Sequence, residues 1–108
     1  MPLNLPKPIA LYLAAVNVGD TTTVAQYFSA DAVVKDEGKT IQGIEAIRRW
    51  MADTREKYHH TMEPLALKEQ GRTAFVTTRL TGSFPGSPIE VGFRFELDTG
   101  KIAKLTIG

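Results

Sequence analysis

Apolar residues recur at helical spacing in two parts of the chain. The first stripe follows a proline-rich start that includes Pro2, and Gly19 stands where this helix would end. It consists of Ile9, Tyr12, Leu13 and Val16. The second stripe runs from Ile44 to Tyr58 in steps of three and four, with charged residues on the other sides. Both patterns predict amphipathic helices that each bury one face.

A short helix is predicted between these two. Asp20 can act as its N-cap, because a carboxylate there accepts hydrogen bonds from the free amide groups of the first turn. The buried side of this helix would carry Val24, Tyr27 and Phe28. Together with the first helix it would form a helical hairpin.

The rest of the chain is typical of strands separated by turn residues. The predicted strands cover residues 32–35, 39–42, 60–69, 73–83, 89–97 and 101–107. Along residues 89–97 apolar and polar side chains alternate, so one face of the sheet would be buried and the other solvated. We expect the last four strands to pair antiparallel. Helices followed by a long antiparallel sheet indicate an α+β domain.

Composition supports one globular domain spanning residues 1–108. The 108 residues are 43% hydrophobic and 23% charged, and the formal net charge is only +1. A charge this small disfavours nucleic acid and anionic membrane surfaces as partners. The longest apolar run, Ile9–Val16, is far shorter than the roughly 20 residues that cross a bilayer, and it resembles a secretion signal only faintly. The chain has no cysteine, which excludes disulfides and fits any compartment equally. We expect a cytoplasmic protein.

Motifs for cofactors and metals are not found in the sequence. It lacks a phosphate-binding glycine loop before a helix and a serine nucleophile elbow, so we expect no cofactor. His59 and His60 are adjacent, would face opposite sides of a strand, and are interpreted as solvent or strand-start residues rather than metal ligands. The charges of Arg48 and Arg49 are balanced at helical spacing, as on a solvated helix face.

Two residues have positions suited to chemistry. Tyr12 lies on an apolar helical stripe, where a buried hydroxyl would need a partner; alternatively its ring reaches the surface. Asp36 alternates with Val34, so a carboxylate would point inward if Val34 does; alternatively it forms the turn before Gly38. The spacing leaves both interpretations open.

A resemblance to a known superfamily bears on this choice. Residues 12–20 and 27–36 resemble the opening of the ketosteroid isomerases and of the wider nuclear transport factor 2-like, SnoaL-like superfamily. Residues 43–50 resemble the start of its third helix, and residues 93–95 and 100–102 resemble its last two strands. The superfamily holds isomerases, polyketide cyclases, dehydratases and noncatalytic binding proteins, so its fold does not decide function.

The resemblance implies a cone, in which a curved antiparallel sheet wraps around the long helix and the helical hairpin closes the wide end. It places Tyr12 where the isomerases keep the donor to an enolate oxygen, and Asp36 where they keep the proton-shuttling base. The second acid of their oxyanion hole is replaced by Val91. The pocket lining it implies, besides Tyr12 and Asp36, is Val16, Val34, Trp50, Val91 and Phe93; Trp50 could equally be a plain core residue.

Two functions follow as hypotheses. The first is an enzyme that transfers a proton next to a carbonyl in a small apolar ligand, without a cofactor, by enolisation as in an isomerase or cyclase. The second is a noncatalytic ligand-binding or dimerisation module of the same fold, which the missing second acid favours. In either case superfamily members commonly pair through the outer face of the sheet, so we expect a homodimer.

Overall fold

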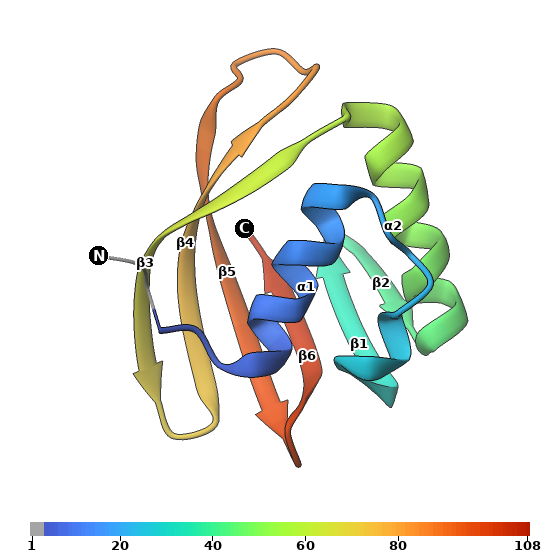
Figure 1. Ribbon diagram of the computed structural model, residues 1–108, viewed down its shortest axis with the longest axis vertical. Helices are drawn as coiled ribbons and strands as arrows, with labels where there is room; N and C mark the ends of the chain where they lie inside the picture. Colours follow the sequence, from blue (N-terminus) through green and yellow to red (C-terminus); the bar gives the residue numbers. More distant parts are fainter. Residues whose placement is uncertain (1–3) are drawn as a thin grey trace.

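The computed structural model describes residues 4–108, and Pro2 lies outside this range (Figure 1). Within this range two α-helices, one 3₁₀ turn and six strands follow one another. Their order is α1 (Lys7–Val18), η1 (Val24–Gln26), β1 (Phe28–Asp36), β2 (Lys39–Gln42), α2 (Ile44–Tyr58), β3 (Thr61–Gln70), β4 (Thr73–Thr81), β5 (Ile89–Asp98) and β6 (Lys101–Ile107). The described chain is therefore an α+β domain, as expected.

The six strands form one curved, unclosed sheet in the order β2-β1-β6-β5-β4-β3. Strands β3 to β6 form an antiparallel meander, and β1 and β2 form an antiparallel hairpin. The two parts join where β6 runs parallel to β1. The expectation of an all-antiparallel sheet is wrong at this pair, because the meander brings β6 back beside β1 in the same direction.

Only one face of the sheet is covered by the helices. On β5 the side chains of Phe93 and Phe95 are buried, whereas Arg94 between them is exposed. Figure 1 shows α1 crossing the sheet and α2 running beside β1 and β2. The alternation predicted for this strand is confirmed from Val91 to Phe95, whereas Ile89 is 40% exposed and Glu96 and Leu97 are both partly buried.

The two predicted amphipathic helices are confirmed. Helix α1 buries the stripe that includes Tyr12 and Val16, and Gly19 ends it with a left-handed backbone of φ 74°. Such a φ favours glycine, because other residues strain their Cβ there. Helix α2 has the expected bounds, Ile44 to Tyr58.

The expected helical hairpin is wrong. Its second member is only the 3₁₀ turn η1, and Phe28 already begins β1. Asp20 caps no helix; its carboxylate accepts hydrogen bonds from the backbone N and the Oγ1 of Thr22, at 2.8 and 2.7 Å. Three successive threonines follow Asp20, and β-branched residues form helices poorly, so a local turn is preferred.

An aromatic cluster joins α1 to the sheet. The Tyr12 ring lies edge-on to the rings of Phe28 and Phe95, with centroids 5.7 and 5.9 Å apart. Tyr27 packs against both Tyr12 and Phe28. Edge-to-face pairs of this kind add to the free energy gained by burial. The cluster fixes the orientation of the Tyr12 ring within the domain.

Candidate functional site

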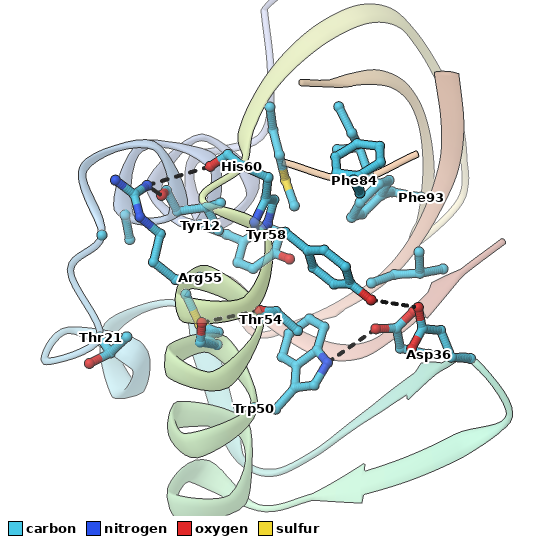
Figure 2. Close-up of a pocket in the computed structure, with 18 of the residues that line it drawn as sticks. Tyr12, Thr21, Asp36, Trp50, Thr54, Arg55, Tyr58, His60, Phe84 and Phe93 are labelled. Atoms are coloured by element: carbon cyan, nitrogen blue, oxygen red, sulfur yellow. Dashed lines mark hydrogen bonds between the residues drawn. The ribbon is translucent and has the colours of Figure 1, made fainter. Parts of the chain in front are cut away.

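A cavity of about 320 Å³ lies between α1, α2 and the inner face of the sheet (Figure 2). Its volume is at the small end of the range typical of ligand sites. Helix α1 contributes Tyr12 and Val16, and α2 contributes one side of its length from Trp50 to Tyr58. Most of the lining is apolar, and its polar groups belong to a few residues on opposite sides of the cavity.

Asp36 ends β1 and faces this cavity. Its Oδ2 accepts a hydrogen bond from the Trp50 indole Nε1 at 3.1 Å. Burial raises the pKa of Asp36, and the charge of Glu37 adds to this rise, whereas the Trp50 hydrogen bond and Lys39 oppose it. A carboxylate with a raised pKa is a stronger base than an ordinary aspartate.

Tyr12 reaches the same cavity from α1. Its side chain is otherwise enclosed by the aromatic cluster, and no hydrogen bond to its hydroxyl is found within residues 4–108. Burial raises the pKa of Tyr12 strongly, with further contributions from Tyr27 and from the charge of Asp36. The phenol is therefore neutral at physiological pH and able to donate a hydrogen bond.

His60 also lines the cavity, which the sequence interpretation missed. Its residue is only 7% exposed, whereas His59 is exposed and ends α2 in a left-handed conformation. Burial lowers the pKa of His60, and the positive charge of Arg55 lowers it further. The signal was present in the sequence: His60 and Met62 are two residues apart on one strand face, and Met62 is apolar.

Arg55 links this part of the cavity to α1. Its Nη1 donates to the carbonyl of Val16 at 2.8 Å and to the carbonyls of Asn17 and His60 at 3.4 Å. These contacts place a cation at the C-terminus of α1, where the helix dipole is negative. The same guanidinium lines the cavity opposite the Asp36 side (Figure 2).

The β4–β5 loop covers part of the cavity. Phe84 and Pro85 line it, and the Phe84 ring meets the Tyr58 ring edge-on at 5.8 Å between centroids. Gly82 permits this approach, because a Cβ there would lie 2.6 Å from the carbonyl oxygen of Tyr58. The sequence identified this loop only as a turn.

The described residues contain no group of three histidine or acidic side chains that could hold a metal ion. In the same range no helix is long and apolar enough to cross a membrane. The charge balance expected on the solvated face of α2 is present at Arg48, which forms an ion pair with Glu45.

Residues 9–105 match the model of the SnoaL-like domain family. The chain belongs to this family. At 36% identity it is similar to a candidate polyketide cyclase, protein SMa1630 of Sinorhizobium meliloti; 97% of this chain and 96% of that one are covered, with a TM-score of 0.93. The SnoaL-like domain matches no curated protein at a significant level.

More distant structures share the fold of this SnoaL-like domain. A protein from Catenulispora acidiphila with a ketosteroid isomerase-like fold, solved with trimethylamine, is 18% identical over 97% of this chain and 86% of its own, with a TM-score of 0.85. The epoxide hydrolase/cyclase-like enzyme SalBIII is 24% identical over 94% and 86%, with a TM-score of 0.78. The match of residues 9–105 to the SnoaL-like domain family, together with this shared fold, confirms the superfamily that the sequence resembles.

The structure of the SnoaL-like domain separates the predicted lining residues into two groups. Val16, Trp50 and Phe93 line the cavity together with Tyr12 and Asp36. Val34 and Val91 are not among the lining residues. Val34 is fully buried and occupies the inward-facing position of β1 that precedes Asp36. Val91 is partly buried and packs against the core.

Proposed function

We propose that this SnoaL-like domain is a small-molecule enzyme that transfers a proton next to a carbonyl without a cofactor. Asp36 is the base and Tyr12 is the hydrogen-bond donor. The observation that carries the proposal is the half-buried Asp36 carboxylate, bonded to Trp50, in the same apolar cavity as the neutral phenol of Tyr12. The match to a candidate polyketide cyclase at 36% identity supports small-molecule chemistry of this class.

The chemistry divides between the two residues. An Asp36 oxygen takes a proton from the carbon next to the carbonyl, and the electron pair of the broken C–H bond moves to the carbonyl oxygen as an enolate. Tyr12 donates a hydrogen bond to that oxygen, which stabilises its developing charge. In a β,γ-unsaturated ketone the enolate is conjugated with the double bond, and Asp36 returns the proton to the γ carbon, so the double bond moves to the α,β position and no atom is gained or lost.

The rest of the cavity limits the substrate to a small apolar carbonyl compound. Val16 and Phe93 supply apolar contacts, and exclusion of water strengthens the hydrogen bonds at the reacting atoms. Val91, where the resemblance places the second oxyanion acid, has no donor group and does not line the cavity, so the proposal assigns the enolate one side-chain donor, Tyr12. Loss of one oxyanion donor costs on the order of 10²–10³ in rate, and we expect slow turnover with small β,γ-unsaturated ketones.

The test is the conversion of 3-cyclohexen-1-one to the conjugated 2-cyclohexen-1-one, followed by ultraviolet absorbance. Asp36→Asn should reduce the rate by about 10²–10⁴, the usual contribution of a general base. Asp31→Asn is the matched control, because Asp31 lies on the same strand and is exposed. If Asp36→Asn leaves the rate unchanged, the mechanism is wrong and a noncatalytic binding module remains.

Two further features stay predictions from the sequence. A homodimer is proposed through the outer sheet face, and a cytoplasmic location also remains a proposal.

A further inference from the structure

His60 lines the cavity and carries a buried polar atom that has no partner. Its Nδ1 is buried and has no hydrogen-bond partner among residues 4–108. In Figure 2 the imidazole is directed toward the inside of the pocket, whereas the backbone carbonyl of His60 faces Arg55. Because a buried polar group without a partner destabilises the fold, such an atom calls for an explanation.

Contacts of the backbone at and beside His60 fix the position from which the imidazole extends. Arg55 donates to the His60 carbonyl at 3.4 Å, and the backbone N of Ser83 donates to the carbonyl of Tyr58 at 2.7 Å. Gly82 packs so closely that a Cβ there would lie 3.0 Å from the Cα of His60. The Tyr58 ring lies edge-on to the imidazole, with centroids 6.3 Å apart. A ligand would therefore meet a preorganised group.

The protonation state of His60 defines the complementary ligand group. Burial and the charge of Arg55 both lower the pKa of His60, so the ring is neutral at neutral pH. A neutral imidazole carries one donor and one acceptor nitrogen. A hydroxyl group both donates and accepts, so it can pair with an imidazole nitrogen in either tautomer.

We propose that His60 binds a hydroxyl group of the substrate, and that the substrate class is an apolar hydroxy-ketone. The proposal rests on the proposed function, which assigns the carbonyl to Asp36 and Tyr12. His60 and Asp36 lie on different sides of the pocket in Figure 2, so the hydroxyl is separated from the reacting carbon. His60 is thus a specificity-determining residue.

The test compares two ketones that differ by one hydroxyl, 2-acetylnaphthalene and 6-acetyl-2-naphthol, whose binding is measured at neutral pH by calorimetry. We expect the natural protein to bind the hydroxylated ketone about tenfold more tightly, as one buried hydrogen bond allows. His60→Leu should abolish this preference. His60→Asn should restore part of it, because its amide places a hydrogen-bonding group near the position of Nδ1. His59→Leu is the matched control and should keep the full preference.

The melting temperature without ligand gives a second readout. Removal of an unpaired polar atom should leave His60→Leu as stable as the natural protein or more stable, and His60→Phe provides a second apolar variant. A loss of stability in both apolar variants that His60→Asn recovers would reveal a partner within the protein and overturn the proposal. A hydroxyl preference that remains in His60→Leu would also overturn the proposal. The proposal would equally be overturned if the natural protein showed no preference, or bound neither ketone.

The binding assay also separates this inference from the proton-transfer mechanism. Asp36→Asn should retain the preference for 6-acetyl-2-naphthol, because binding of the hydroxyl requires no base. If this preference depends on His60 while 3-cyclohexen-1-one conversion does not depend on Asp36, only the proposed reaction fails. If conversion depends on Asp36 but the preference is independent of His60, only the present inference fails.

Discussion

The indole Nε1 of Trp50 donates a hydrogen bond to Oδ2 of Asp36 at 3.1 Å, which joins the middle of α2 to the end of β1. This bond fixes the orientation of a carboxylate at the rim of an apolar cavity. It also opposes the rise in the pKa of Asp36 that burial causes. Trp50 therefore positions Asp36 and moderates its basicity at the same time.

Replacement of Trp50 tests this relationship. Trp50→Phe keeps an aromatic ring but removes the donor, so the pKa of Asp36 should rise further above its ordinary value of about 3.9. The measurement is an NMR titration of the Asp36 carboxyl. Tyr58→Phe is the matched control, since the Tyr58 hydroxyl bonds to Glu37 rather than to Asp36. An unchanged pKa of Asp36 in Trp50→Phe would contradict the assigned role.

Asp36 should make the protein less stable above its own pKa. Its folded-state pKa is raised, so the folded state holds the proton to higher pH than the unfolded chain does. Stability from Asp36 is therefore complete below about pH 3.9 and is lost as pH rises through the folded-state pKa. Asp36→Asn should melt at a higher temperature than the natural protein at neutral pH, and the difference should vanish at acidic pH.

Thermal melts followed by circular dichroism across this pH range check the prediction. Asp31→Asn changes the same atoms at an exposed position and should show no such difference. A stability loss in Asp36→Asn at neutral pH would mean that the ionised carboxylate stabilises the fold, contrary to its burial.

Periodicity was enough to predict the long elements of this fold. The stripe from Ile44 to Tyr58 predicted α2 with its bounds, and strict alternation predicted the buried face of β5. The short second helix failed because its expected N-cap, Asp20, bonds locally to Thr22 instead. The parallel pair of β1 and β6 could not be predicted from local pattern, since it arises from the path of the whole chain.

The candidate site was only partly accessible from the sequence. Asp36 and Tyr12 were identified by alternation, by helical spacing and by the resemblance. His60 was missed because the two adjacent histidines were interpreted together as solvent or strand-start residues, although the two-residue spacing from the apolar Met62 distinguishes His60 from His59. The Trp50–Asp36 bond joins residues on different elements, and such a contact depends on how α2 packs on β1. Spacing within one element carries no information about that packing.

Arg55 should affect both stability and His60. Arg55→Gln removes the charged donor to the carbonyls at the end of α1, and the free energy of unfolding should fall by about 1–3 kcal/mol. It also removes the positive charge that lowers the pKa of His60, so this pKa should rise, while burial still keeps it below the ordinary value. Urea denaturation and an NMR titration measure the two effects. Arg49→Gln, on an exposed face of the same helix, should change neither.

The outer face of the sheet should form a homodimer interface. This face carries mixed polar residues and the 39% exposed side chain of Phe75, over which Arg94 stacks at 5.8 Å from the ring centroid. Sedimentation at about 100 µM should give the dimer mass, because interfaces of standard size support tighter association than that. Phe75→Glu should shift the protein toward monomer. Val18→Glu, which places the same charge on an exposed apolar residue of α1, should not. A monomer mass for the natural protein would refute the interface.

Val91→Asp tests whether position 91 can supply the second oxyanion donor. Val91 lies directly opposite Thr78 in the β4–β5 ladder, so the two side chains share one face of the sheet. The Oγ1 of Thr78 is buried and has no hydrogen-bond partner among the described residues. Since directly opposed Cβ atoms are only about 4.5–5.5 Å apart, a carboxyl group introduced at position 91 should pair with this hydroxyl.

We therefore expect Val91→Asp to fold with little loss of stability and to convert 3-cyclohexen-1-one no faster than the natural protein. Thr78→Val should then cost more stability in the Val91→Asp background than in the natural protein, where it removes an unpaired hydroxyl from the core. Melting temperatures of the four proteins in this cycle measure the coupling. A rise in conversion rate with no coupling to Thr78 would show the opposite, that a side chain at position 91 reaches the substrate in the cavity.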